Sequence, residues 1–402
     1  MSDFFASGRE TLRPAFADRP LPLLSYGALN CSSVYIMASK SLATKTDAFA
    51  KLLTSLGGKV KGSYIGLGSH TPIHEVVDII KDVRQLGGID CLITLGGGSL
   101  TDGGKLVRFA IANNAYTAEE INTLWGGHSH NPAKRAHVET PTMPLICIPI
   151  SLSGGEYQHI AGATEKVSRA KRTFEPHVDP TVVIQDPELC LMTPQWLWLS
   201  SGIRAVDHCV ETLCSLRSNE KGDSEAKKGL EKLVPGLLRC KHSATDLEAR
   251  HLCHLGVVEA MSAVSSGVPL GASHAIGHQL GPLGVGHGET SCILLPAVCK
   301  YNAQKGANND RQSVVRDTLL AQKPLQELLT KSSLEAAKMD LGDILDVMIR
   351  DLEMPRSLKA VNVGKDKLDL LATNSLHDLW IKTNAVPMTE KSQVMEVLNN
   401  GG

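Results

Sequence analysis

The stretch CLITLGGGSLTDGGK, residues 91–105, joins an apolar run to a glycine-rich turn. The run at 91–95 is apolar almost throughout, which is typical of a parallel strand covered on both faces. Three glycines follow without a break, and a backbone that lacks Cβ atoms can turn sharply and approach a phosphate closely. We expect a helix from about Thr101, whose N-terminal N–H groups and dipole favour an anion. The stretch therefore predicts a strand, a phosphate-binding turn and a helix.

Two known phosphate-binding patterns do not match this turn. A Walker A loop requires a glycine at the position of Ser99 and a serine or threonine after Lys105, where the chain has Leu106. The pattern GxGxxG fails here too, and it fails at residues 66–68, where the third glycine is missing. Ser99 is expected to cap the helix or to donate to a phosphate oxygen. An ordinary glycine-rich turn is the alternative.

Short apolar runs alternate with helical patterns in the first half of the chain, which predicts βαβ units and a parallel sheet. The predicted strands lie at residues 34–38, 62–68, 91–95, 145–150 and 182–184. Long helical patterns dominate after residue 193. We therefore expect an α/β dinucleotide-binding domain over 1–190 and an all-α substrate and catalytic domain over 191–402, with the ligand in the cleft between them.

The composition narrows the classes of partner. The net charge is -1 and the sequence has no block of basic residues. The chain therefore lacks the concentrated positive charge that binds nucleic acid or an anionic membrane. No apolar run reaches the roughly 20 residues that span a bilayer, and residues 1–16 have no apolar core of signal-peptide length. The ten cysteines form no CxxC pair, so we interpret them as reduced thiols. We expect a cytoplasmic protein that acts on a small molecule.

Histidines gather in the sequence GASHAIGHQLGPLGVGH, residues 271–287. His274 and His278 are four apart, so a helix would place both imidazoles on one face. A glycine- and proline-rich loop separates them from His287.

A second motif, SGIRAVDHCVET at residues 201–212, is predicted to be helical. Arg204 and His208 are four apart on one face, while Asp207 lies about 100° away around the helix. Asp207 is expected to pair with Arg204 at the i, i+3 spacing. The four histidines of the two motifs suit a transition metal or an acid–base site, and hydrogen-bonding side chains that line a cleft are the alternative.

In their order along the chain, these motifs resemble the iron-containing alcohol dehydrogenase superfamily, and most closely its maleylacetate reductase branch. The resemblance implies a Rossmann-like parallel-sheet domain followed by a helical-bundle domain, a fold shared with dehydroquinate synthase. It also implies a nicotinamide cofactor and a homodimer. The matching motifs are GGGSLTDGGK (96–105), IPISLSGGEYQHIAGATE (148–165), SGIRAVDHCVET (201–212), GASHAIGHQLGPLGVGH (271–287) and ETSCILLPAVCKYN (289–302).

The resemblance places the nucleotide site on three groups of residues. These are Gly97, Gly98, Ser99 and Asp102 around the pyrophosphate, Ser151, Leu152, Ser153 and Gly154 in a second loop, and Lys171 downstream. NAD enzymes usually place an acidic residue after an early strand, where it holds the ribose. Here Ser39 and Lys40 follow the strand at 34–38. Their presence favours NADPH, or the use of both NADPH and NADH.

Metal-dependent members of the superfamily use one aspartate and three histidines. The histidine positions fall on His208, His274 and His287, and a further active-site histidine falls on His278. The aspartate position holds Arg204, which cannot ligate a cation and would repel one. Reductases of the maleylacetate type have also lost this carboxylate and are thought to work without metal. We therefore expect no metal, with zinc or iron on the three histidines as the alternative.

The resulting hypothesis is an NAD(P)H-dependent reductase that transfers hydride to a carbonyl or enone. Arg204 and protonated His208 or His274 would stabilise the oxyanion, and His278 would donate the proton. Arg204 could instead clamp a substrate carboxylate, or form only a surface salt bridge with Asp207. The alternative functions are a metal-dependent alcohol dehydrogenase and a non-redox dehydratase, cyclase or isomerase on the same scaffold.

Overall fold

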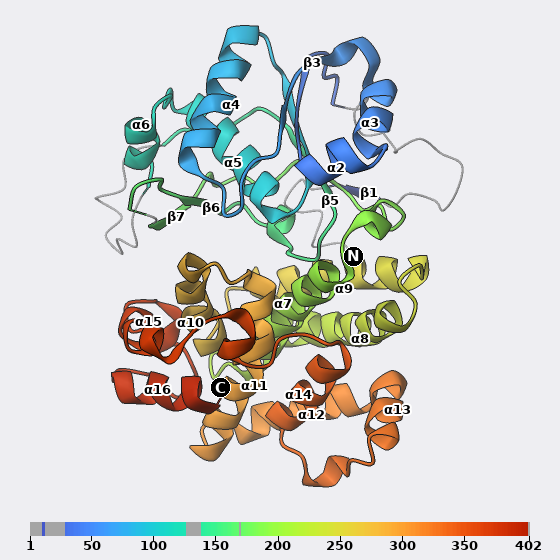
Figure 1. Ribbon diagram of the computed structural model, residues 1–402, viewed down its shortest axis with the longest axis vertical. Coiled ribbons are helices and arrows are strands. Elements are labelled where there is room, and N and C mark those ends of the chain that lie inside the picture. The colour runs from blue at the N-terminus through green and yellow to red at the C-terminus, as the bar shows by residue number, and fades with distance from the viewer. Residues whose placement is uncertain (1–9, 13–28, 126–137, 169, 401–402) are drawn as a thin grey trace. The chain divides into compact units, whose positions relative to one another are not determined.

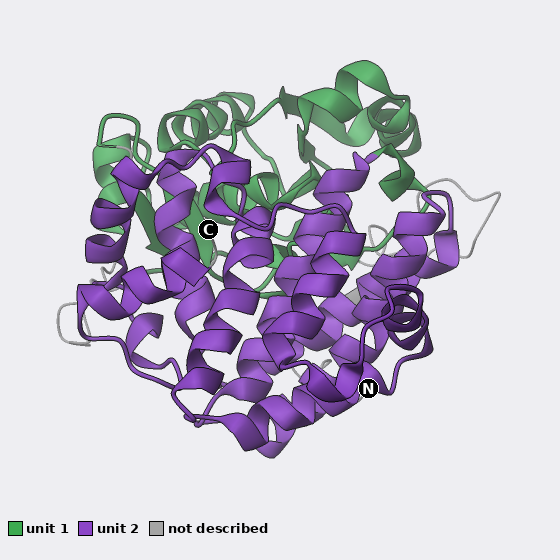
Figure 2. Ribbon diagram, turned by 60° about the horizontal axis from the view of Figure 1, so that its bottom comes forward, with its two compact units in different colours: residues 1–192 green, residues 193–402 purple. Residues whose placement is uncertain are grey.

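A computed structural model describes residues 10–12, 29–125, 138–168 and 170–400 of the chain. The chain forms two compact units, residues 1–192 and 193–402, drawn in different colours in Figure 2. The change from alternating strands and helices to long helical patterns predicts this division at residue 190. Residues 1–16 are predicted to contain no signal peptide, and most of them lie outside the described residues. No helix in the described ranges is long and apolar enough to cross a membrane.

The first unit is built on a parallel sheet of six strands in the order β1-β8-β5-β4-β2-β3 (Figure 1). The predicted parallel sheet is confirmed, and β1 is an additional edge strand that pairs with β8. The strands are β1 (Glu10–Leu12), β2 (Val34–Ala38), β3 (Val60–Ile65), β4 (Cys91–Gly96), β5 (Leu145–Pro149) and β8 (Val182–Ile184). Every residue of β2, β4 and β5 is buried, as the run at 91–95 indicated.

Helices and a hairpin cover this sheet. The helices are α2 (Lys40–Lys45), α3 (Ala48–Leu56), α4 (Ile73–Leu86), α5 (Gly98–Ala112) and α6 (Ala118–Thr123). The hairpin pairs β6 (Ala161–Thr164) with β7 (Lys171–Phe174) in antiparallel fashion and was not predicted. Apolar side chains of α4, α5 and the hairpin form one core with alternate residues of β2, β4 and β5. This core fixes the ends of the strands, where the nucleotide loops begin.

The second unit is helical, as predicted. Its helices are α7 (Gln195–Cys214), α8 (Glu220–His242), α9 (Leu247–Val264), α10 (Ala272–Leu280), α11 (His287–Gln304), α12 (Asn309–Leu320), α13 (Lys323–Lys331), α14 (Leu341–Asp351), α15 (Leu368–Ser375) and α16 (Lys391–Asn400). The helical spacing of apolar residues over 314–332 predicts a single helix, but the structure has two there, α12 and α13. Pro324 stands in the first turn of α13, where a residue without an N–H can begin a helix but not continue one.

Helix α7 is the buried centre of this unit. Nearly every residue from Trp198 to its end is buried, and α8 packs closely against it. A Cβ on Gly229 of α8 would stand 2.6 Å from the sulfur of Cys209 on α7. Because α7 has no solvent-exposed face along this length, each polar side chain on it must find partners inside the protein. Those partners include the residues predicted to be catalytic.

Candidate active site

The glycine turn after β4 contains a position that requires glycine. Gly96 has a φ of +155°, and a Cβ there would stand 2.3 Å from Cδ1 of Leu100. Gly97 is the N-cap of α5, and its carbonyl oxygen accepts the N–H groups of Leu100 and Thr101 at 3.0 and 3.4 Å. The helix therefore begins at Gly98, three residues earlier than predicted, because the Gly97 carbonyl closes its first turn.

Ser99 does not cap this helix, so that part of the prediction is wrong. Its hydroxyl accepts the N–H of His70 at 3.0 Å, and its carbonyl accepts the hydroxyl of Thr71 at 2.9 Å. Thr71 has a φ of +52°, which is unfavourable for a β-branched residue. Ser99 thus holds a strained turn against α5. By helix geometry the N–H groups of Gly97, Gly98 and Ser99 have no acceptor inside the helix, and a phosphate would meet them there.

The second nucleotide loop lies beside the glycine turn, because β5 is the neighbour of β4 in the sheet. A Cβ on Gly97 would lie 3.8 Å from Oγ of Ser151, and a Cβ on Gly98 would lie 3.4 Å from Cβ of Ser153. The two serine hydroxyls are 2.8 Å apart. Gly154, with a φ of +74°, turns the chain away afterwards. The structure therefore brings the two predicted loops together.

The remaining residues that are predicted to bind the nucleotide in this region are Leu152, Ser39 and Lys40. Leu152 is buried in the second loop. Ser39 follows β2 directly, its N–H donates to the carbonyl of Leu95 at 3.0 Å, and its side chain caps α2. Lys40 is the first residue of α2 and is exposed.

Asp102 and Lys105 fasten α5 to the segment that leads into the hairpin. Nζ of Lys105 is 2.9 Å from the Asp102 carboxylate and donates to the carbonyl of Gly155 at 2.9 Å, although its side chain is wholly buried. Asp102 also accepts the N–H of Gly162 at 3.1 Å. A Cβ on Gly162 would meet both Asp102 and Lys171 within 4 Å. Asp102 and Lys171 therefore lie together, and Asp102 has a structural function at this helix start.

On α7 of the second unit, Arg204 faces inward. Its Nη1 donates to Oγ of Ser291 at 3.2 Å and lies 3.9 Å from Oδ2 of Asp207, and its side chain is 11% exposed. Within the part of the chain that the structure describes, Ser291 is the only hydrogen-bond partner of this guanidinium. The expected i, i+3 pair with Asp207 is present, but the pair is buried, so a surface salt bridge is the wrong description.

Asp207 is wholly buried and accepts two hydroxyl groups. Oγ of Ser273 and Oγ of Ser291 donate to its Oδ2 at 2.8 and 2.6 Å. Burial raises the pKa of Asp207 to about 6, while the Arg204 charge and the two hydroxyls act in the opposite direction. Asp207 thus connects α7 to both α10 and α11.

Glu211, one turn further along α7, was not among the predicted residues. Its carboxylate accepts the N–H groups of Gly271 and Ser273, each at 2.8 Å, and lies 2.8 Å from Nδ1 of His274. Burial, with the nearby Asp207 charge, raises the pKa of Glu211 to about 8. The sequence carried a signal for this residue, because Glu211 follows Arg204 by seven positions and so shares its helix face.

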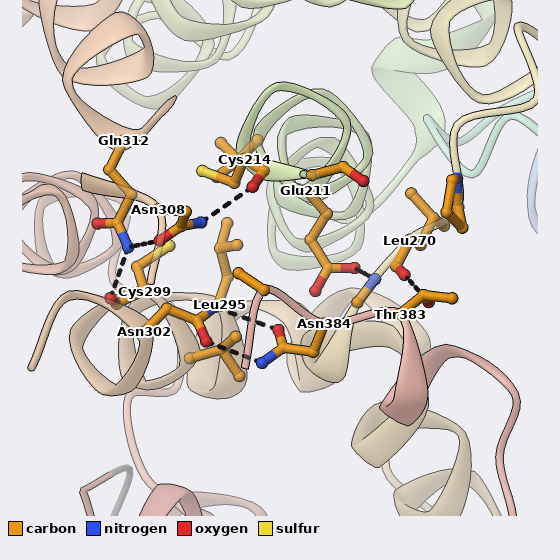
Figure 3. Close-up of a pocket in the computed structure, with 16 residues that line it drawn as sticks. Glu211, Cys214, Leu270, Leu295, Cys299, Asn302, Asn308, Gln312, Thr383 and Asn384 are labelled. Carbon is orange, nitrogen blue, oxygen red and sulfur yellow. Dashed lines mark hydrogen bonds between the residues drawn. The ribbon is translucent and has the colours of Figure 1, made fainter. Parts of the chain in front are cut away.

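A small cavity of about 20 Å³ lies beside Glu211 and is lined by both apolar and polar side chains (Figure 3). This volume suits a single water molecule. The side-chain amides of Asn302 and Asn384 pair with each other there, and Asn308 and Gln312 donate to backbone carbonyls. The cavity therefore lies beside buried, hydrogen-bonded amide side chains and is too small for an organic substrate.

His208 and His274 stack with their ring centroids 4.7 Å apart. Burial lowers the pKa of His208 to about 3 and holds that of His274 well below its usual range, and the Arg204 charge acts in the same direction on both. Both imidazoles are thus neutral at neutral pH. These shifts disfavour the protonated His208 or His274 that the sequence predicts as oxyanion stabilisers, whereas the Arg204 guanidinium beside them is a cation.

His278 and His287 complete the cluster. Their ring centroids are 6.4 Å apart, and His287 is the first residue of α11. Nδ1 of His278 lies 2.9 Å from Oδ2 of Asp378, and the Trp380 ring lies 5.2 Å from the His278 ring. Trp380 also presents an edge to His274 at 5.7 Å. The structure therefore gathers the predicted catalytic residues around α7, α10 and α11, and it adds Asp378 and Trp380, which no local pattern indicated.

The group of Asp207, Glu211 and His274 does not fit a divalent cation. Asp207, Glu211 and His274 bring ligand atoms within 4.8 Å of one another. Nε2 of His274 and Oδ1 of Asp207 are buried acceptors without a hydrogen-bond partner in the described chain. A cation could use such acceptors, but the guanidinium of Arg204 already lies 3.9 Å from Asp207 and would repel a second positive charge. Both oxygens of Glu211 are occupied by backbone N–H groups.

Comparisons with known proteins agree with this description. Two family models match the chain, "Iron-containing alcohol dehydrogenase" over residues 25–187 and "Fe-containing alcohol dehydrogenase family, C-terminal" over residues 198–401. Dehydrogenase FUM7 of Gibberella moniliformis is 36% identical, with 94% of this chain and 95% of that protein covered. The chain therefore belongs to the iron-containing alcohol dehydrogenase family and is an oxidoreductase.

Two solved structures share the fold. Maleylacetate reductase from Rhizobium sp. strain MTP-10005 is 25% identical, with a TM-score of 0.70 over 98% of this chain and 95% of that one. Sulfoacetaldehyde reductase from Bifidobacterium kashiwanohense, solved in complex with NAD+, is 18% identical, with a TM-score of 0.77 over 98% and 96%. These likenesses confirm the predicted combination of a Rossmann-like unit and a helical unit.

Proposed function

We propose that the protein uses NADPH or NADH to reduce a carbonyl, or a double bond conjugated to one, in a small organic substrate without a metal ion. The observation that carries this proposal is Arg204. Its guanidinium is a buried, fixed cation among neutral histidines, and most of its five donors are unused within the described chain. A fixed donor of this kind stabilises the oxyanion that forms when hydride reaches a carbonyl or an enone.

The residues of the first unit fit a dinucleotide. The N–H groups of the first turn of α5 and the hydroxyls of Ser151 and Ser153 would hold the pyrophosphate, and the bound cofactor would supply the hydride. The exposed Lys40, at the end of β2, supports a preference for NADPH because a lysine there suits a ribose 2′-phosphate.

In the second unit, Arg204 would donate hydrogen bonds to the substrate oxygen as negative charge develops on it. His278, at the last turn of α10, would deliver the proton that completes the reduction. His208 and His274, neutral and stacked, would shape the pocket and exclude water from the oxyanion. Asp207 and the serine hydroxyls that it binds would keep Arg204 in place.

The redox and metal parts of the proposal are tested with the purified full-length protein. NADH and NADPH oxidation is measured with maleylacetate and with short aliphatic aldehydes, with and without a chelator. We expect turnover that survives chelation and a lower KM for NADPH than for NADH. Activity that is lost on chelation and restored by zinc or iron would overturn the metal-free mechanism, and a strong preference for NADH would overturn the assignment of Lys40.

The role of Arg204 is tested by substitution. Arg204→Gln removes the charge and should lower kcat/KM by about 100-fold to 1000-fold, the usual cost of losing an oxyanion donor. Arg204→Lys keeps the charge without the planar fork and should retain more activity. Arg350→Gln is the control, because this arginine is 58% exposed and pairs with Asp346 on the same helix. Equal activity of wild type and Arg204→Gln would refute the role.

A further inference from the structure

The segment of residues 378–384 holds α10 at both of its ends. At the last turn of α10, the Asp378 carboxylate contacts Nδ1 of His278. At the start of α10, the segment makes two hydrogen bonds, from Thr383 to the carbonyl of Leu270 and from the N–H of Ala272 to Asn384. These contacts join positions 100 to 113 residues apart in the chain. The segment thus fixes the orientation of the helix that carries two of the site histidines.

The contact between Asp378 and His278 has the geometry of a directed hydrogen bond. The distance from Nδ1 to Oδ2 is 2.9 Å, and Asp378 is only 14% exposed. The other carboxylate oxygen, Oδ1, accepts the N–H of Trp380 at 3.0 Å. With both oxygens engaged, the carboxylate cannot turn away from the imidazole without losing a backbone hydrogen bond.

Trp380 restrains the imidazole from a second direction. Its ring lies 5.2 Å from the His278 ring at an interplanar angle of 37° and meets the His274 ring edge-on. Asp378 and Trp380 belong to one turn, so a single backbone feature sets both the hydrogen bond and the ring packing of His278.

An ionised carboxylate can only accept hydrogen bonds, so Nδ1 of His278 must carry a proton when it faces Asp378. The other ring nitrogen of His278 is Nε2. We propose that Asp378 is a positioning residue that keeps the proton on Nδ1 of His278, so that the imidazolium form of His278 donates its Nε2 proton to the substrate oxygen. This donation leaves the neutral imidazole with its proton on Nδ1, and a proton from water then restores the imidazolium. The proposal rests on the proposed reductase function, because it assigns the atom through which that reaction is protonated.

The tautomer of His278 can be observed without any substrate. Long-range proton–nitrogen NMR spectra of histidine side chains report which ring nitrogen is protonated, and the signals of His278 are those that vanish in His278→Gln. We expect a protonated Nδ1 in the wild type and in Asp378→Glu. In Asp378→Asn the amide can either donate or accept, so a population with protonated Nε2 should appear.

Kinetics then show whether this orientation matters for the reaction. With maleylacetate or an aldehyde as substrate, Asp378→Asn should lower kcat by about tenfold to a hundredfold, as the loss of a residue that orients a histidine usually does. The KM for the cofactor should stay unchanged, and Asp378→Glu should restore part of kcat. Asp369→Asn is the matched control, because this carboxylate is 77% exposed on α15 and pairs with Lys391.

Two results would overturn the proposal. One is a wild-type His278 with Nδ1 unprotonated, which remains decisive even if Asp378→Asn does not fold. The other is a folded Asp378→Asn whose tautomer shifts while kcat stays at the wild-type value. If the tautomer behaves as expected but the wild type oxidises neither NADH nor NADPH with any carbonyl, the positioning by Asp378 is supported and the reductase function is rejected.

Discussion

Arg204 alone changes the chemistry of a site whose other positions resemble a metal centre. A carboxylate at this position would attract a cation, whereas the guanidinium lowers the pKa of both His208 and His274. The same charge opposes the rise that burial causes in the pKa of Asp207. Burial, as the larger cause, and the Arg204 charge thus lower the pKa of both imidazoles, and in the proposed mechanism Arg204 would supply the positive charge that a metal would otherwise provide.

His254 shows how burial of a titratable group links stability to pH. Its side chain is packed against the Trp198 ring at 5.4 Å, and burial lowers its pKa from 6.5 to about 3. The unfolded chain binds a proton at this residue below about pH 6.5, whereas the folded chain does not until about pH 3. The contribution of His254 is therefore complete above pH 6.5 and is lost as the pH falls. Between pH 7 and pH 5 we expect this residue to remove about 2 kcal/mol of unfolding free energy.

The measurement is urea unfolding of wild type and His254→Gln at both pH values. The glutamine has no proton to gain, so the variant should lose about 2 kcal/mol less than the wild type on acidification. His242→Gln is the control for removing an imidazole, since His242 is 65% exposed on α8. Parallel losses in wild type and His254→Gln would contradict the linkage.

The junction of β4 and α5 depends on a single glycine. Gly96→Ala would place a methyl group 2.3 Å from Leu100 Cδ1 at a φ of +155°. Strain of this kind costs about 1–3 kcal/mol. Rotation of the Leu100 side chain can relieve the clash but not the unfavourable φ, and a shift of the backbone at residue 96 would displace the adjoining first turn of α5, whose N–H groups would bind the pyrophosphate. We expect a lower unfolding free energy and a higher Kd for NADPH, measured by urea unfolding and by fluorescence titration.

Gly58→Ala is the matched control for this substitution. Gly58 lies outside the left-handed region, and a Cβ there would have no neighbour within 4 Å. This variant should keep the wild-type stability and the wild-type Kd. Wild-type stability and a wild-type Kd in Gly96→Ala would show that the junction of β4 and α5 does not require glycine at this position.

Elements with a strong local pattern were predictable. The strands predicted at 34–38 and 91–95 are present as β2 and β4. Hairpin β6–β7 was not predicted because its strands are short and its position depends on a distant residue. The buried Lys105 of α5 donates to the carbonyl of Gly155, in the segment that precedes β6. In the site, Glu211 could have been found by helical spacing, whereas the contact from Asp378 to His278 spans 100 residues and leaves no periodic signal.

Each of the two units has its own apolar core. One joins the sheet to α4, α5 and the hairpin, and the other joins α10 and α11 to α15 and α16. The proposed phosphate contacts all belong to the first unit. A ligand that binds only the folded form stabilises whatever unfolds together with its site.

This organisation predicts where a bound cofactor protects the chain from hydrogen exchange. At an NADPH concentration about 100 times Kd, core amides of β4 and β5 should exchange up to about 100-fold more slowly, which corresponds to about 2.7 kcal/mol. Amides of α15 and α16 should exchange at an unchanged rate, because their core contains no phosphate contact. Gly96→Ala should abolish the protection. Equal slowing in α15 and α16 would instead show that both units unfold as one cooperative body, with the cofactor stabilising the entire chain.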